Sequence, residues 1–402
     1  MPEITLLGDL APVGIGAFST RPAASGSELV LGNLETPLCT AATAPRPKAG
    51  PHLRADPAVA TALNAAWPNL VVAFANNHAA DYGADGIAQT VQALSAAGIR
   101  CVGAGTSLQE ATRPLFVTCG GLRVAMVSLC DRWSGLAESD RAGVAPLSAG
   151  LAPALARLRT QADRVILSVH GGPELSSWPS PRWQELLRSA VDAGADIVHA
   201  HHPHVSQGWE HHGRGWIFYG LGNTLAHPAG WPNVLTRFSL QARLDLSDLE
   251  RPPMMSAWNC DADGDALVLR QVATLEEGSP EATVRNRPLG DPLLLEGLHQ
   301  EYALRLWSAF YADRLSIGET TRHRLRTLAR AGRDIVQACL VPGAWRRHLR
   351  ARRLFHHHLF STATHADELA TALAVLSGER TDRRTPETRA LADRLIPAAL
   401  FH

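Results

Sequence analysis

Short apolar runs alternate with amphipathic segments through much of the chain. Residues 70–78 (LVVAFANNH) form an apolar run, typical of a buried strand, that ends in polar side chains. Residues 83–99 (GADGIAQTVQALSAAGI) carry apolar side chains at helical spacing and predict a helix that Gly98 ends. The alternation continues as helix, strand, helix and strand over residues 151–162, 164–172, 180–195 and 196–205. This pattern predicts a parallel-rich α/β domain with functional loops at the carboxyl ends of the strands.

Other segments refine this layout. Residues 56–67 predict a helix with Asp56 as its N-cap and Pro57 in the first helical position. Residues 114–130 indicate two strands joined in a hairpin at Gly120–Gly121. Further strand-like runs cover residues 3–10, 28–35, 215–225, 234–246 and 266–275. The expected α/β fold is therefore a mixed sheet, or two packed sheets, flanked by helices.

The character of the chain changes after Arg285, and we place a domain boundary there. Residues 1–285 are assigned to the α/β domain and residues 286–402 to an arginine-rich helical extension. Within the extension, residues 344–360 (AWRRHLRARRLFHHHLF) have a basic face and apolar residues at roughly helical spacing: Trp345, Leu349, Phe355 and Leu359. Two interpretations stay open, a helical cap with solvated or packed arginines, or docking to an anionic membrane or a protein partner.

Charge and cysteine content narrow the function classes. Formal net charge is zero and the pI is about 7.3, so no nucleic-acid partner is expected. The cysteines are scattered without a Cys-x-x-Cys pair, which favours buried free thiols over disulfides or a zinc site. The N-terminal residues do not resemble a signal peptide, and no apolar run is long enough to span a membrane, so a cytoplasmic protein is expected.

Polar groups able to bind metal or phosphate end most of the predicted strands. These residues are Asp9, Asn33, Glu35, Asn76, Asn77, His78, His170, His199, His201, His202, His204 and Asn223, with Glu174 close to His170 in the sequence. Each cluster alone is compatible with a simple turn. Because the strands of one sheet bring their ends together, we expect these groups to converge on one shared site at a single sheet edge.

The donors of this site are nitrogen and oxygen atoms without thiolate. This combination suits one or two catalytic divalent ions, with Mn, Fe or Zn favoured, better than a structural zinc site with sulfur ligands. Two such ions would bind a bridging hydroxide and hold both oxygens of a displacement at phosphorus. A histidine that is not bound to metal would then protonate the leaving oxygen.

The same motifs, taken in order, match a known family. The matching segments are LLGDL, LVLGNLETPL, VVAFANNHAADYGADGIAQTVQALSAAGI, VILSVHGGPE, PSPRWQELLRSAVDAGADIVHAHHPHVSQGWE and IFYGLGNT, all within residues 4–225. The chain resembles the CapA/PgsA family, which is named for poly-γ-glutamate capsule biosynthesis and whose fold belongs to the calcineurin-like metallophosphoesterases. The resemblance implies a four-layer αββα sandwich with a metal site at the strand ends.

The resemblance also implies a role for each site residue. The metal ligands would be Asp9 and His204 for one ion, Asn77, His170 and His202 for the other, and Glu35 bridging both, with Asn33 as the other candidate for the bridge. His78 would be the general acid or would orient the phosphate, and Asp81 would orient His78. Asn33 and Asn223 would line the substrate site.

Two functions of different classes stay open. The first is a metal-dependent hydrolase that uses a metal-bound hydroxide to cleave a phosphoester, or a related bond, of an anionic small molecule or polymer. The second is a non-hydrolytic accessory in poly-γ-glutamate, capsule or other polymer biosynthesis. This second hypothesis is motivated by Asp9, which is followed by Leu10 and Ala11 where the wider superfamily has Asp-x-His. Substrate specificity is expected to reside in loops 39–53 and 131–145.

Overall fold

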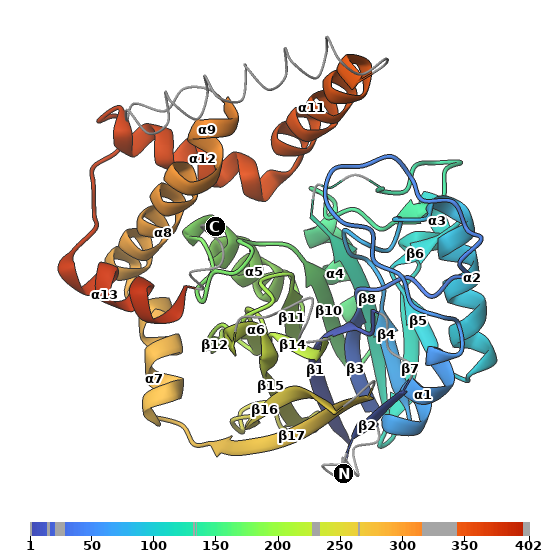
Figure 1. Cartoon of the computed structure of the whole chain (residues 1–402). Helices are drawn as coiled ribbons and strands as arrows, with labels where there is room; N and C mark the ends of the chain where they lie inside the picture. Colours follow the sequence, from blue (N-terminus) through green and yellow to red (C-terminus); the bar gives the residue numbers. More distant parts are fainter. Residues whose placement is uncertain are drawn as a thin grey trace.

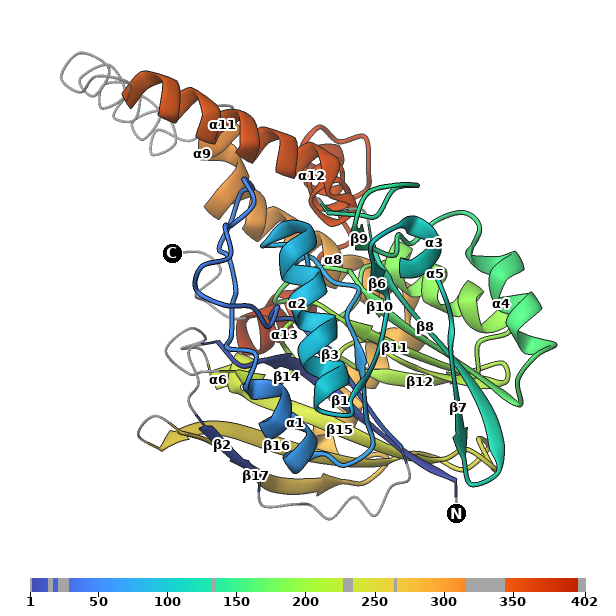
Figure 2. The ribbon, with the colours of Figure 1, turned by 90° about the vertical axis from the view of Figure 1, so that its right-hand side faces the viewer.

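Two β-sheets lie face to face, and helices cover the outer face of each (Figure 1, Figure 2). The computed structural model describes residues 2–13, 17–20, 29–131, 133, 135–226, 234–263, 266–315 and 344–396. The helices that follow the sandwich in the sequence lie beside and above it in Figure 1.

The larger sheet has nine strands within the described residues. Its path runs β2-β17-β16-β15-β1-β3-β4-β5, and β14 also pairs with β1. The strands are β1 (Glu3–Ala11), β2 (Ala17–Thr20), β3 (Leu29–Leu34), β4 (Leu70–Ala73), β5 (Arg100–Val102), β14 (Asn223–Ala226), β15 (Phe238–Asp245), β16 (Met254–Asp263) and β17 (Ala266–Leu275). Because β1 is parallel to β3 and β14 but antiparallel to β15, the sheet is mixed.

Among the described residues, the smaller sheet has six strands in the order β12-β13-β11-β10-β8-β7. They are β7 (Leu115–Cys119), β8 (Leu122–Cys130), β10 (Arg164–His170), β11 (Ile197–His201), β12 (Trp209–His212) and β13 (Gly215–Phe218). β7 and β8 form the predicted hairpin, and β8, β10, β11 and β13 run parallel. The short strands β6 (Ala104–Gly105) and β9 (Gly143–Val144) pair separately. The predicted run 215–225 is split, because β13 lies in this sheet and β14 in the larger one.

Buried apolar clusters fill the layers of the sandwich. Leu6 of β1 shares the cluster between the sheets with Ile166 of β10. A second cluster joins the larger sheet to α1 (Val59–Ala66) and α2 (Gly83–Ala96), and a third joins the smaller sheet to α4 (Leu151–Arg159) and α5 (Pro181–Asp192). Cys119 and Cys260 are free thiols buried in the first and second clusters. Both sheets are therefore covered on both faces, and the expected four-layer αββα sandwich is confirmed.

Two local predictions are wrong at their starting residues. α1 begins at Val59, not at Pro57, and Asp56 accepts a hydrogen bond of 2.9 Å from the backbone N–H of Ala58 in the preceding turn. Asp56 therefore closes a turn before the helix and is not its N-cap. Residues 234–246 were expected to be one strand, but they begin with one helical turn, α6 (Val234–Arg237), before β15. The remaining helices before residue 290 are α3 (Leu108–Ala111) and α7 (Pro280–Asn286).

The extension is helical where it is described. Its elements are a 3-10 turn (Arg287–Gly290), α8 (Pro292–Leu306), a π-helical turn (Trp307–Tyr311), α9 (Ala312–Leu315), α11 (Ala344–Ser361), α12 (Ala363–Leu376) and α13 (Pro386–Leu395). Tyr302, Tyr311 and Leu369 share a buried cluster with Trp178, which belongs to the α/β part. The extension is therefore packed onto the sandwich. The boundary at residue 285 stays a prediction.

One side of α11 packs against this cluster. Leu359 is buried in it and Phe355 is partly buried against it, whereas the described arginines are exposed: Arg350, Arg352 and Arg353. The side chains of Trp345 and Leu349, and all of residues 316–343, lie outside the described residues.

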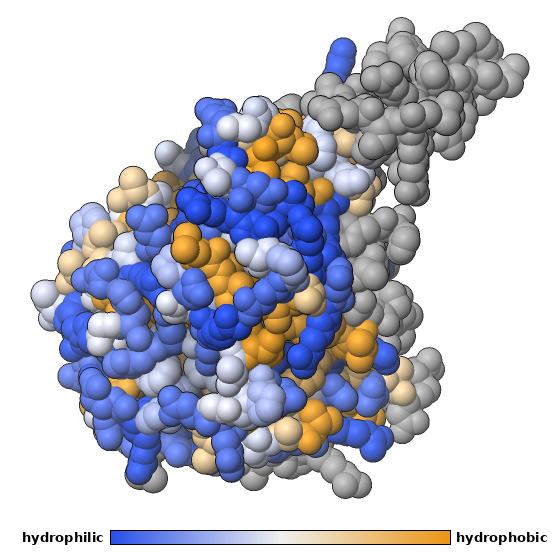
Figure 3. Space-filling model, turned by 90° about the vertical axis from the view of Figure 1, so that its left-hand side faces the viewer, coloured by the Kyte–Doolittle hydropathy of each residue, from blue (hydrophilic) through white to orange (hydrophobic). Residues whose placement is uncertain are grey.

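The described helices and surface were compared with the open interpretation that the extension docks to an anionic membrane. None of the described helices combines the length and the apolar character needed to cross a membrane. On the side that is left in Figure 1, which includes α8 and α13, apolar patches are interrupted by hydrophilic residues (Figure 3).

Candidate metal centre

The polar side chains at the ends of the strands meet at one end of the sandwich. Asp9 lies in β1 and Glu35 follows β3 in the larger sheet, whereas His170 ends β10 and His202 follows β11 in the smaller sheet. The expectation of a single sheet edge is therefore wrong. The groups come from two facing sheets, so each sheet supplies part of the site.

Close packing of two backbones positions Asp9. The backbone N–H of Asp9 donates to the carbonyl of Gly222 at 2.8 Å, and the N–H of Gly8 donates to Thr224 Oγ1 at 2.8 Å. A Cβ atom at Gly8 would overlap the Gly222 carbonyl oxygen, so only glycine allows β1 to approach this closely. The motif Gly-Asp thus fixes the carboxylate of Asp9 next to Asn223, its partner in the parallel pairing of β1 and β14.

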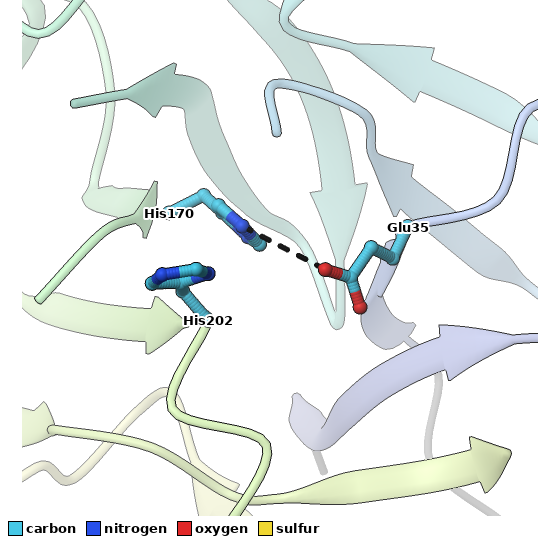
Figure 4. Close-up of side chains that lie close together, drawn as sticks. All are labelled: Glu35, His170 and His202. Carbon is cyan, nitrogen blue, oxygen red and sulfur yellow. Dashed lines mark ion pairs between the residues drawn. The ribbon is translucent and has the colours of Figure 1, made fainter. Parts of the chain in front are cut away.

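Two groups of three side chains place potential ligand atoms within 4.8 Å of one another. The first group is Asp9, Glu35 and His204, with His204 Nδ1 3.5 Å from Asp9 Oδ2 and His204 Nε2 3.5 Å from Glu35 Oε1. The second group is Glu35, His170 and His202, with His170 Nε2 3.9 Å from Glu35 Oε1 (Figure 4). Both groups are fully buried, and Glu35 belongs to each of them.

The backbone after β11 is strained where it presents its imidazoles. His202 has φ of 102° and His204 has φ of 58°, both in the left-handed region that residues other than glycine seldom adopt. Such conformations cost on the order of 1–3 kcal/mol each and persist only where surrounding structure enforces them. With this backbone conformation, the His202 and His204 rings, on either side of Pro203, reach different ligand groups.

Several donor and acceptor atoms here are buried without a hydrogen-bond partner among the described residues. They are Glu35 Oε1 and Oε2, His170 Nε2, His202 Nδ1 and Asn77 Oδ1. Burial raises the pKa of Glu35 to about 8 and lowers the pKa values of His170 and His202 well below the usual range. Leaving such atoms unpaired is costly unless a cation binds them. The donor set therefore fits one or two divalent ions.

Asn33 and Asn76 have supporting positions. Asn33 Nδ2 donates to Asp9 Oδ1 at 2.8 Å, while Asn33 Oδ1 accepts from Asn76 Nδ2 at 3.2 Å. The Asn33 amide thus turns its nitrogen toward Asp9, an arrangement that orients the carboxylate and leaves the bridging position to Glu35. Asn76 Oδ1 accepts from the backbone N–H groups of His78 and Ala79, so Asn76 shapes the turn after β4.

His78 lies outside both ligand groups and is held by two neighbours. Its Nδ1 is 2.9 Å from Asp81 Oδ2 and 3.2 Å from Lys48 Nζ, and Lys48 also forms an ion pair with Asp81. Burial lowers the pKa of His78 to about 4. Lys48 was not predicted as a site residue, although it is the only lysine of the chain and lies in one of the expected specificity loops.

Two further side chains complete the arrangement. His201 Nδ1 lies 3.1 Å from Asp9 Oδ1, so an imidazole from β11 reaches Asp9 even though no histidine follows it in β1. His201 was predicted to lie in the cluster, but no role was predicted for it. Asn223 Oδ1 lies 3.0 Å from His204 Nδ1 and so orients that ring, in keeping with a site-lining residue.

Comparison of the sequence with known proteins identifies a family. The sequence pattern described as "Bacterial capsule synthesis protein PGA_cap" matches residues 17–228. The "Capsule biosynthesis protein CapA" of Bacillus anthracis is 30% identical over 269 residues, which cover 65% of this chain and 61% of that protein. A "Probable polyglutamine synthesis accessory protein" of Mycobacterium tuberculosis is 35% identical over 186 residues, which cover 43% of this chain and 49% of that protein.

A solved structure of a hypothetical protein from Thermus thermophilus aligns with 68% of this chain and 96% of its own, at 15% identity and a TM-score of 0.35.

The chain spans between about half and two thirds of the length of the two curated relatives, and α7 and the helices after it lie beyond the matched pattern. The pattern covers more than half of the chain. It includes the candidate ligands Glu35, Asn77, His170, His202 and His204. The chain belongs to the family of bacterial capsule synthesis proteins described as PGA_cap.

Proposed function

We propose that this protein is a metal-dependent hydrolase that cleaves a phosphoester, or a related bond, of an anionic substrate. The supporting observation is Glu35, whose buried carboxylate belongs to both ligand groups while both of its oxygens lack a hydrogen-bond partner in the described chain. A shared carboxylate would put two cation positions side by side, as two-metal hydrolysis requires.

The side chains around this centre would divide the remaining work. Bound Mn, Fe or Zn ions would supply Lewis acidity and lower the pKa of water. Asp9, Glu35, Asn77, His170, His202 and His204 would hold the ions. His78 would face the leaving group through Nε2, because Nδ1 is turned to Asp81. Lys48 adds a positive charge next to His78, where an anionic substrate would need it.

A second candidate function is an accessory role in polymer synthesis, and the name of the Mycobacterium tuberculosis relative supports it. In that role the same centre would bind an anionic chain or metabolite without turnover, and the extension would contact a partner or an anionic membrane. Elemental analysis combined with a broad phosphatase screen separates the two functions. Metal-loaded protein without turnover of any phosphoester favours the accessory role, and unchanged activity in metal-free protein contradicts the hydrolase.

Substitution His78→Ala is expected to lower turnover of a chromogenic phosphodiester by about 10²–10⁴-fold, because it removes the group that assists the leaving oxygen. Metal content should stay at the wild-type level, since His78 belongs to neither ligand group. His211→Ala is the matched control, because His211 is exposed on β12 away from the ligand groups. Full activity of the His78 variant would exclude this role for the imidazole.

A further inference from the structure

A cavity of about 250 Å³ lies where the extension meets the metal centre. His202, Trp133 and Glu174 line it from the α/β part, and Phe310, His365 and Glu368 line it from the extension. The extension is anchored beside it, because Thr364 Oγ1 donates to the carbonyl of Gly172 at 3.1 Å. The extension thus forms one wall of a cavity whose other wall includes a candidate metal ligand.

Trp133 links the two walls. Its ring centroid lies 5.1 Å from that of His202 on one side, and 5.1 Å and 6.3 Å from those of His358 and His365 on the other. Its Nε1 is buried without a hydrogen-bond partner among the described residues. An anionic group bound beside His202 would offer an acceptor on that side of the ring.

The other unsatisfied group of the cavity is acidic. Glu368 is 2% exposed, and its Oε1 has no hydrogen-bond partner in the described chain, whereas Oε2 accepts from the Tyr311 hydroxyl at 3.2 Å. Burial raises the pKa values of Glu368 and Glu174, and the nearby Asp367 and Glu174 carboxylates raise the pKa of Glu368 further. Burial lowers the pKa of the adjacent His365 to about 3, so this histidine supplies no counter-charge at neutral pH.

A cation bound beside these carboxyl groups would stabilise their ionised form, and an organic cation suits the cavity better than a metal ion. Within the described residues, the metal-ligand groups are the two that contain Glu35, and neither includes Glu174 or Glu368. The cavity is also much larger than a bare ion, and aromatic rings form part of its wall. Aromatic faces and carboxylates together are the usual environment of ammonium groups.

We propose that this cavity binds a primary ammonium group of the substrate between Glu368 and Glu174, against the Trp133 ring. The anionic group of the same molecule lies at the metal centre, so the natural substrate carries both charges. The position of the anionic end rests on the proposed function, whereas the ammonium site rests on the cavity alone.

Calorimetric titration of Mn²⁺-loaded protein tests this substrate class. The ligands are ω-aminoalkylphosphonates of increasing chain length, each compared with the alkylphosphonate of equal length and with the alkylammonium ion. At the best length, the amino group is expected to tighten binding about tenfold, as one desolvated ammonium contact would. Glu368→Gln keeps the side-chain volume and should reduce this gain to about twofold or less. Glu379→Gln, at an exposed position, should leave it unchanged.

The outcomes separate this proposal from the proposed function. Equal affinities for amino and plain phosphonates at every length would overturn the ammonium site and leave the metal centre intact. Alkylammonium binding that disappears in Glu368→Gln, without phosphonate binding, would support the cavity and contradict the proposed binding of the anionic group at the metal centre. If Glu368→Gln does not fold, the wild-type comparison still decides, and Glu174→Gln is the second variant. If Glu368→Gln and Glu174→Gln both keep the full gain in affinity that the amino group provides, the ammonium site is also overturned.

Discussion

Replacing Glu35 by glutamine is expected to abolish metal binding at both proposed positions at once. Glu35 belongs to both ligand groups, whereas His202 and His204 each belong to one. A glutamine of the same shape offers only a neutral amide, which binds divalent ions far more weakly than a carboxylate bridge does. Elemental analysis after dialysis should find metal in wild-type protein and almost none in the variant. For the proposed hydrolase, phosphodiester turnover should fall by at least about 10³-fold, because the substitution would remove the metal-based part of catalysis.

The stability of the same variant distinguishes loss of metal from loss of fold. In metal-free protein, Glu35→Gln should change the free energy of unfolding by no more than about 1 kcal/mol, since it removes a buried carboxyl without hydrogen-bond partners among the described residues. Added Mn²⁺ should raise the Tm of wild-type protein but not of the variant. Glu277→Gln, at an exposed position, is the matched control and should behave as wild type in each measurement. A Glu35 variant that retains both metal and activity would refute the shared-ligand assignment.

Gly8→Ala is expected to destabilise the protein by more than about 3 kcal/mol, which exceeds most overpacking substitutions. The added methyl group would overlap the backbone of Gly222, so β1 and β14 would have to separate. That separation would break the hydrogen bond between Asp9 N–H and the Gly222 carbonyl and displace the Asp9 carboxylate. Thermal and denaturant unfolding measure the effect, and metal titration of any folded fraction should show weaker binding.

Gly290→Ala provides the control for this substitution. No atom lies within 4 Å of a Cβ built at Gly290, and its φ is not in the left-handed region. This variant should differ from wild type by less than about 1 kcal/mol. A Gly8 variant as stable as the Gly290 variant would show that β1 and β14 can move apart without cost.

Much of the α/β part could be predicted from local sequence. Buried parallel strands appear as apolar runs, and amphipathic helices show a helical period, so β10 and α5 were found with nearly correct ends. The start of β11 was also found, but the strand ends at His201, before the predicted end at residue 205. The wrong starts of α1 and β15 concern single turns, where side-chain contacts with the backbone decide between a turn and a helix. Asp56 shows this, because its carboxylate satisfies a backbone N–H before the helix begins.

The sequence by itself determined which polar side chains stand at strand ends: Asp9, Glu35, His170, His202 and His204. Their position follows from the apolar run that precedes each of them, which is a local property. Their roles as ligands stay predictions. Only the tertiary structure decided that Glu35 is shared by two groups, because sharing depends on how two separate sheets face each other.

The tertiary structure also brought in residues that no local pattern marks. Lys48 reaches His78 from a loop, and Glu368 reaches the cavity beside His202 from the extension. A single lysine in a loop and a glutamate in an amphipathic helix look like ordinary surface residues in the sequence. Lys48 becomes half-buried and Glu368 buried because packing of distant segments excludes water from them, and that exclusion depends on the whole fold.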